Sequence, residues 1–175
     1  GQLNRGLLLG LFHALGSTRL IAGTVCDSCA AAGWDAAVGS IGGSDPESVV
    51  ESDLIVSWGA DLLTTNLHLW PLVEQARARG AKLVVIEPRR SATAARADWH
   101  LRVNVGSDAA LALGVMHVLA REGLCDRDYL ARETLGFERL ERDVLPRFTP
   151  ARVAEITGVS VADLERLARM YGGAR

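Results

Sequence analysis

Two apolar runs, separated by an amphipathic segment, constrain the fold more than any other feature of this sequence. The runs DLIVSW (53–58) and KLVVIE (82–87) are continuous and apolar, which is typical of strands buried on both faces of a sheet. The residues between them predict a helix over 68–79 that ends at Gly80. Each run ends in a small polar turn, so the pattern predicts parallel strands whose ends could meet a phosphate-bearing ligand.

The rest of the chain extends this pattern. Strands alternate with helices up to about residue 108, and helices alone follow. Asp108 is expected to cap a helix that ends at Gly123, and four further helices should follow, with starts at Thr149-Pro150 and Ser160 among them. The earlier expected elements are helices over 3–15, 28–38 and 91–97, a helix start at Asp45-Pro46-Glu47, and strands over 19–25 and 100–105. The order predicts an α/β fold, with a Rossmann-like parallel sheet, flanking helices and a C-terminal helical extension.

Composition excludes several classes of protein. With 175 residues, 49% of them hydrophobic and 23% charged, the chain is expected to be globular. A net charge of −2 argues against nonspecific binding to nucleic acid. No apolar run approaches the roughly 20 residues that span a bilayer, so no transmembrane segment is expected. Three cysteines do not make a disulfide framework, which favours a cytoplasmic location, or a periplasmic one if the full-length protein carries an export signal.

The first strand runs into the turn Trp58-Gly59-Ala60-Asp61. Gly59 lets the backbone turn sharply and approach a ligand, to which Asp61 and Thr65 could form hydrogen bonds. The N-terminal amides of a helix from Asn66 to Arg79 would face a phosphate. The alternative is that Trp58 belongs to the core and Gly59 is a plain turn. The fingerprint GxGxxG is absent here, which disfavours a standard nicotinamide site.

The second strand ends at Glu87, and Pro88 stops the ladder because it lacks an N–H. Arg89 and Arg90 supply planar, permanently charged donors suited to phosphate, although a solvated arginine pair on a loop is the alternative. Ser91 or Thr93 can cap the short helix that follows.

A third strand end lies at NVGSD (104–108), where Gly106 permits close approach of a ligand. Asp108 follows Gly106 at a helix N-terminus, and its alternative role is a plain N-cap.

Cys26 lies where a strand gives way to a helix, a setting that lowers a thiol pKa and favours the thiolate. It forms a CxxC pair with Cys29. A zinc site would need two more ligands, so thiol exchange or a buried structural role for Cys29 are the readings that remain open.

Taken together, these strand ends resemble the molybdopterin oxidoreductase family, the dimethyl sulfoxide reductase superfamily. The resemblance covers nearly all of the chain but only about a quarter of a typical family member. The segments that carry it are WGAD (58–61), HLWP (68–71), GAKLVVIEPR (80–89), Ala97-Asp98, GSDAAL (106–111) and the helical tail from Thr149 to Tyr171.

The resemblance implies a cofactor of molybdenum or tungsten held by two pyranopterin guanine dinucleotides. Residues 1–108 would then form the guanine-dinucleotide-cofactor domain, with residues 109–175 as a helical extension packed on it. Cys26 aligns with the position that supplies a metal ligand, and it would be the catalytic residue. The cofactor-binding residues implied are Trp58, Gly59, Asp61, Thr65, Glu87, Pro88, Arg90, Gly106 and Asp108.

The resemblance also implies partners. A [4Fe-4S] cluster is expected in the full-length protein outside this chain, as are the rest of the catalytic subunit, an iron–sulfur electron-transfer subunit and a small-molecule substrate. Five residues depart from the family pattern. Asp61 stands for Asn, Glu87 for Asp, Asn104 for Pro, Ser107 for Thr, and Asp27 for the His that formate dehydrogenases place after the metal ligand. Two alternatives remain open: a non-catalytic scaffold with the same fold in a respiratory complex, and a thiol-redox protein using Cys26 and Cys29.

Overall fold

The computed structural model describes residues 2–16, 24, 27–39 and 42–174, and the chain divides into two compact units, Gly1–Ser44 and Asp45–Arg175. The first unit contains α1 (Gln2–Ala14) and α2 (Asp27–Val38), which confirms two of the predicted helices. The strand predicted over residues 19–25 falls, except for Thr24, outside the described residues. The predicted domain boundary at residue 108 lies within the second unit and stays a prediction.

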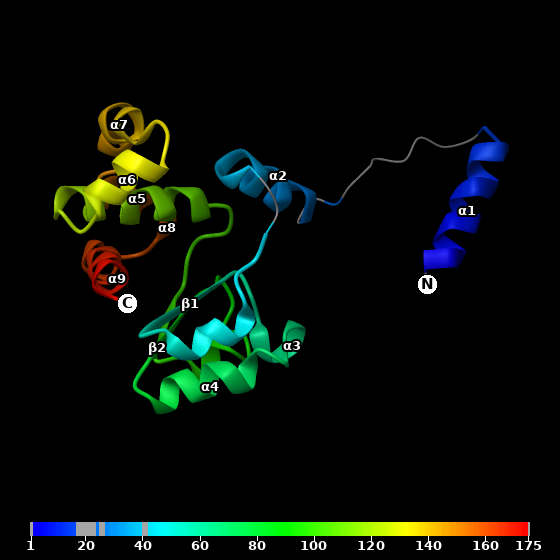
Figure 1. The fold of residues 1–175 in the computed structure, drawn as a ribbon, viewed down its shortest axis with the longest axis horizontal. Coiled ribbons are helices and arrows are strands. Elements are labelled where there is room, and N and C mark those ends of the chain that lie inside the picture. Colours follow the sequence, from blue (N-terminus) through cyan, green and yellow to red (C-terminus); the bar gives the residue numbers. More distant parts are fainter. Residues whose placement is uncertain (1, 17–23, 25–26, 40–41, 175) are drawn as a thin grey trace. The chain divides into compact units, whose positions relative to one another are not determined.

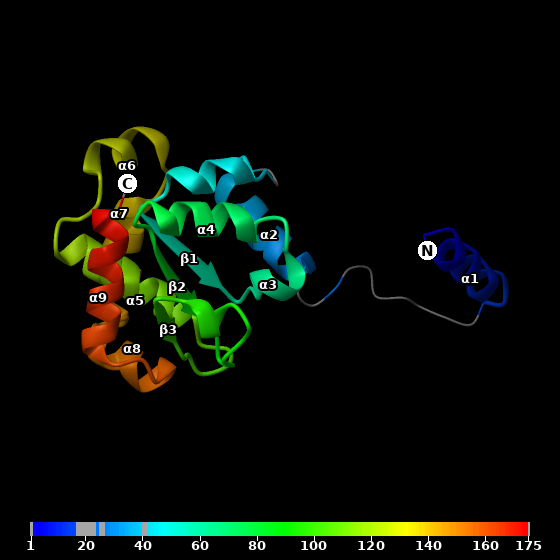
Figure 2. The ribbon, with the colours of Figure 1, turned by 90° about the horizontal axis from the view of Figure 1, so that it is seen from below.

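The second unit is built on a three-stranded sheet in the order β1-β2-β3. Its strands are β1 (Leu54–Trp58), β2 (Lys82–Ile86) and β3 (Trp99–Leu101), and both pairings are parallel, as predicted. Figure 2 shows the arrows of β1 and β2 pointing the same way. The strand predicted over 100–105 is shorter than expected. The backbone N–H of Asn104 donates to the carbonyl of Thr157 (2.8 Å), outside the sheet.

Helices cover both faces of this sheet (Figure 1). One face packs against η1 (Pro46–Glu51), α3 (Leu62–Thr65), α4 (Trp70–Ala78) and η2 (Ala94–Arg96). The other face packs against α5 (Asp108–Arg121), α8 (Pro150–Thr157) and α9 (Val161–Gly173). In β2, Leu83 and Val85 enter the first cluster while Val84 and Ile86 enter the second, all with 0% exposure. β2 is therefore buried on both faces, as its continuous apolar sequence predicted.

Capping side chains set several helix starts where the sequence predicted them. Asp45 accepts a hydrogen bond from the N–H of Glu47 (3.0 Å), and Ser160 accepts one from Asp163 (3.1 Å). Thr149 caps α8 in the same way. The remaining elements, all helical as predicted, are α6 (Arg127–Glu133), α7 (Phe137–Arg139), η3 (Leu140–Val144) and η4 (Leu145–Arg147).

Three boundaries differ from the prediction. The helix expected from residue 66 or 68 begins at Trp70, because residues 62–65 form the separate short helix α3 and a turn follows it. The helix expected over 91–97 is a single 3₁₀ turn, Ala94–Arg96, preceded by Ser91, whose hydroxyl accepts from the N–H of Ala94 (3.1 Å). The N-cap of α5 is Ser107, and Asp108 is its first residue.

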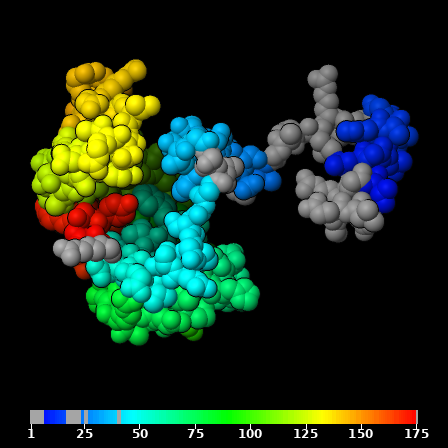
Figure 3. Space-filling model, in the orientation of Figure 1, coloured from blue at the N-terminus to red at the C-terminus, as the bar shows by residue number. Residues whose placement is uncertain are grey.

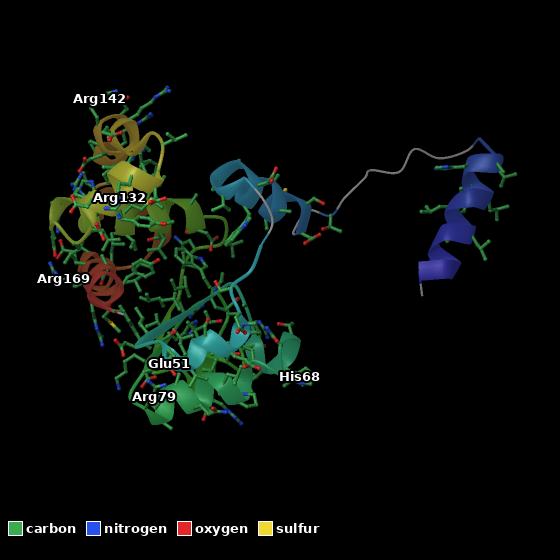
Figure 4. All side chains as sticks on the ribbon, viewed as in Figure 1. Glu51, His68, Arg79, Arg132, Arg142 and Arg169 are labelled. Atoms are coloured by element: carbon green, nitrogen blue, oxygen red, sulfur yellow. The ribbon has the colours of Figure 1, made fainter. Side chains whose placement is uncertain are left out.

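Ion pairs join elements at the surface of the second unit. The guanidinium of Arg79, just after α4, donates to both carboxylate oxygens of Glu51 at the end of η1 (2.8 and 2.9 Å; Figure 4). Figure 3 shows the cyan surface around η1 lying directly on the green surface of α4. None of the helices among the described residues is long and apolar enough to cross a membrane.

A second set of charges links α5 to α9. Arg169 donates to Glu122 through two nitrogens (both 2.8 Å), and Arg121 donates to Glu122 and to Glu165 (both 2.8 Å). The hydrogen bonds from Arg169, followed by those from Arg121, lower the pKa of Glu122 from 4.5 to about 2. Because the folded pKa is depressed, the stabilisation is present above pH 4.5 and is lost as the pH falls towards 2.

We therefore expect Glu122→Gln to lower the thermal unfolding midpoint at pH 7, and the difference from the wild type to shrink below pH 4.5. Because the pairs are exposed, added salt should reduce the difference as well. Thermal unfolding followed by circular dichroism across pH checks this, with Glu155→Gln on α8 as an exposed control. A difference that stays constant from pH 7 to pH 2 would contradict the role of this charge.

Candidate functional site

The carboxyl ends of the strands meet at one edge of the sheet. Trp58, the last residue of β1, is in register with Ile86 of β2, which is in register with Leu101 of β3. Beyond the strands, Gly59 N–H donates to the carbonyl of Ile86 (2.9 Å) and Glu87 N–H donates to that of Leu101 (3.1 Å). We call the residues that follow these strand ends, 58–65, 87–93 and 104–108, the strand-end surface.

Asp61 ties two parts of this surface together. One oxygen of its carboxylate accepts hydrogen bonds from the backbone N–H (3.0 Å) and the hydroxyl (2.7 Å) of Thr93, and the other accepts one from the hydroxyl of Thr64 (2.7 Å). The Thr93 hydroxyl accepts in turn from the N–H of Leu63 (3.1 Å). The bonds from Thr93 and then Thr64 hold the pKa of Asp61 below its ordinary value. The Asp61 carboxylate is thus occupied by its own protein, and it joins the turn after β1 to the loop after β2.

The hydrogen bonds between Asp61 and Thr93 give a testable prediction. Thr93 is fully buried, so Thr93→Val should lower the free energy of unfolding by about 1–3 kcal/mol, since the N–H of Leu63 loses its acceptor and Asp61 loses a donor. Thr93→Ser keeps the hydroxyl and removes one methyl group, so it should cost about 0.8 kcal/mol. Urea unfolding of the two variants measures both costs. A loss in Thr93→Val no larger than that in Thr93→Ser would contradict the role of the hydroxyl.

The turn after β2 is held by β3. The carbonyl of Glu87 lies 2.8 Å from Nε2 of His100, which must therefore carry the proton, and Nε of Arg102 donates to the carbonyl of Pro88 (3.3 Å). The Glu87 carboxylate accepts only a long hydrogen bond from the N–H of Arg89 (3.4 Å). Sequence reasoning identified neither His100 nor Arg102 as part of the site. The only feature of the sequence that could have pointed to them is that they occupy alternate positions of the expected edge strand.

The two arginines of the turn differ. Arg89 lies 3.9 Å from Asp61, with its side chain 74% exposed. Arg90 is exposed and has no hydrogen-bond or ion-pair partner within the part of the chain that the structure describes. Both guanidinium groups therefore have donors to offer a ligand.

Gly59 and Gly106 fit a surface that a ligand approaches closely. Their φ angles are +62° and +79°, a region that residues with a side chain rarely adopt. No atom lies within 4 Å of the position that a Cβ would take at either residue. The backbone at both turns is therefore open.

The third strand end joins the same surface through Trp58 and Asp108. The indole Nε1–H of Trp58 donates to Oδ1 of Asp108 (2.7 Å), so the start of α5 lies beside the end of β1. The hydroxyl of Thr65, another predicted ligand contact, instead donates to the carbonyl of Asp61 (3.0 Å) within its own helical turn.

The remaining predicted site residue is Cys26. Cys26 falls outside the described residues, while Cys29 is exposed on α2 and forms no disulfide. No cluster of three or more metal-ligating side chains occurs among the residues that the structure describes. An open pocket lies at the opposite edge of the sheet, where β1 and β2 begin, and none of its lining residues belongs to the predicted site.

The fold is an α/β domain in which a three-stranded parallel sheet packs between helices and ends in polar turns. The family comparison is specific: the pattern of the molybdopterin oxidoreductase family matches residues 6–168. The chain belongs to this family.

Relatives agree with this assignment. The chain is 40% identical over 161 residues to the probable oxidoreductase YoaE of Bacillus subtilis (strain 168), covering 92% of this chain and 23% of that protein. It is 32% identical over 166 residues to the assimilatory nitrate reductase catalytic subunit of the same organism, with the same coverage of both chains. The structure of acetylene hydratase from Pelobacter acetylenicus superposes with a TM-score of 0.64 at 30% identity, over 71% of this chain and 19% of that one. The chain thus spans about a quarter or less of the length of these proteins.

Proposed function

We propose that this chain is the cofactor-binding part of a molybdenum or tungsten oxidoreductase whose metal is held by two pyranopterin guanine dinucleotides. The observation that carries the proposal is the meeting of three polar strand ends at one edge of the sheet, within a chain of this family. Family membership supports the pterin and the metal. The guanine dinucleotide form rests on the chemistry of the strand-end surface.

That chemistry fits such a group. The carboxylates of Glu87 and Asp108 are acceptors of the kind that the N–H groups of guanine require. The exposed guanidinium groups of Arg89 and Arg90 suit phosphate oxygens. The open backbone at Gly59 and Gly106 would let a planar ligand or a phosphate approach the main chain.

When bound, the cofactor would supply two-electron redox chemistry at its metal, and the protein would bind, orient and tune it. The pterin and phosphates would lie against Trp58, Gly59 and Thr65. Asp61 would act through its hydrogen bonds with Thr93 rather than by direct contact with the cofactor. Glu87, Pro88 and Arg90 would hold the guanosine end together with Gly106 and Asp108. A thiolate at Cys26 would be a suitable ligand for a soft metal centre.

The proposal extends to partners outside this chain. An iron–sulfur relay that includes a [4Fe-4S] cluster would exchange electrons with the site, and the substrate would be a small molecule. One relative is named as the catalytic subunit of a nitrate reductase, which fits an assembly with separate electron-transfer subunits. Another is named a hydratase, a class of enzyme that adds water. The redox reaction is therefore itself part of the proposal.

Metal and nucleotide analysis of the complete product of the gene tests this function. We expect molybdenum or tungsten at one atom per protein, and two equivalents of GMP after acid hydrolysis of the purified protein. A protein with neither metal nor guanine nucleotide would instead fit a scaffold with the same fold. Metal without guanine nucleotide would retain the family chemistry and reject the dinucleotide form.

A further inference from the structure

Trp58 makes a contact that its sequence position did not predict. It is the last residue of β1 and is half-buried, and its ring packs against the hydrophobic cluster that includes α5, α8 and α9. Its Nε1–H donates to Oδ1 of Asp108 at 2.7 Å, across 50 positions of sequence. An indole nitrogen is only a donor and a carboxylate only an acceptor, so the direction of this bond is fixed.

This bond determines how Asp108 presents its carboxylate. An acidic side chain in the first turn of a helix commonly turns back to the free backbone N–H groups there. Among the described residues, no backbone N–H of α5 donates to Asp108, and its Oδ1 is used by Trp58 instead. The other oxygen, Oδ2, has no partner within the described part of the chain. Asp108 thus combines one anchored oxygen with one free acceptor at the strand-end surface.

We propose that Trp58 is a positioning residue: its indole N–H fixes the carboxylate of Asp108 so that Oδ2 accepts an N–H from the base of a guanine nucleotide. The inference rests on the proposed function. On guanine, N1–H and the neighbouring 2-amino group are both hydrogen-bond donors, whereas N1 of adenine is an acceptor. A free carboxylate oxygen facing this edge of the base therefore favours guanine over adenine. Fixing the carboxylate before binding also reduces the entropy that is lost when the ligand binds.

The test compares the affinities of GDP, IDP and ADP for the complete gene product, prepared without cofactor, by isothermal titration calorimetry. Trp58→Phe keeps an aromatic ring in the core and removes the N–H. We expect it to weaken GDP binding about tenfold and ADP binding much less, because Asp108 loses the hydrogen bond that positions its free oxygen for the guanine base. IDP lacks the 2-amino group, so the preference for GDP over IDP should fall as well.

Two further single variants and one double variant complete the test. Trp70→Phe, in α4 on the other face of the sheet, is the matched control and should bind GDP like the wild type. Asp108→Asn keeps an acceptor for Trp58 but replaces the free acceptor with an amide donor, so it should reduce the preference for GDP over ADP. Asp108 is exposed, so this variant is expected to fold even if Trp58→Phe does not. In the Asp108→Asn background, adding Trp58→Phe should weaken GDP binding no further.

Several outcomes overturn the inference. Trp58→Phe with unchanged GDP affinity would overturn it and leave the proposed function intact. So would equal losses for GDP and ADP, or the same loss in the Asp108→Asn background, because both indicate an effect of packing. An Asp108→Asn protein whose preference for GDP over ADP is undiminished would also overturn it. A wild-type protein that binds neither GDP nor IDP would overturn both the inference and the guanine assignment.

Discussion

Replacing Cys26 with alanine is expected to abolish turnover by the complete gene product while the guanine nucleotide content stays at the wild-type level. Loss of a residue that only supports a metal ligand commonly costs about 10–100-fold, and loss of the ligand itself should cost more. In the proposed function the nucleotide is bound by other residues, those of the strand-end surface. The change should therefore separate loss of chemistry from loss of cofactor.

Cys29→Ala is the matched control, because Cys29 is the other member of the pair and is exposed on α2. It should retain turnover. X-ray absorption at the metal edge gives a second measurement, in which Cys26→Ala should show one sulfur ligand fewer. Full turnover in Cys26→Ala would reject its role as metal ligand, and loss of turnover in both variants would favour thiol exchange through the CxxC pair.

Gly106→Ala is expected to reduce the guanine nucleotide content of the purified protein by tenfold or more. A Cβ at this residue would project into the open space of the strand-end surface, and the backbone there has a φ of +79°. A residue with a side chain in this region costs about 1–3 kcal/mol. The expected loss of nucleotide therefore combines a steric effect with strain, and a control must separate the two.

Gly123→Ala provides that control. Gly123 has a φ of +69°, and no atom lies within 4 Å of its Cβ position either, but it follows the far end of α5. The two variants should lower the thermal unfolding midpoint by similar amounts, and only Gly106→Ala should lose nucleotide. Equal loss of nucleotide in both variants would attribute the effect to stability and would count against a ligand at Gly106.

The sequence predicted the parts of the fold that local patterns determine. Continuous apolar runs located β1 and β2, because a strand buried on both faces needs apolar residues at every position. Parallel pairing then placed Gly59 and Glu87 at the same edge, as expected. Asp45, Thr149 and Ser160 located helix starts because a capping side chain acts within three residues of itself.

Contacts between distant residues could not be predicted in the same way. Asp61 was expected to face the ligand; one of its oxygens accepts from Thr93, 32 residues away, and the other accepts from Thr64. Trp58 was expected either to contact the cofactor or to lie in the core, and it donates to Asp108, 50 residues away. From the sequence alone, Asp61 and Trp58 could each form a hydrogen bond with many other residues. Only the tertiary arrangement selects Thr93 and Asp108 as their partners. The local signal for a helix from residue 66 was also insufficient, since α3 and a turn occupy that segment.

Hydrogen exchange measured by mass spectrometry on the complete gene product, with and without GDP, tests the shared strand-end site most directly. Peptides that cover residues 58–65, 87–93 and 104–108 should become protected together when the nucleotide binds. Peptides from the opposite edge, around Asp53, Lys82 and Arg169, should not change. Protection confined to that opposite edge, or to only one of the three strand ends, would contradict a common site for a guanine-bearing cofactor.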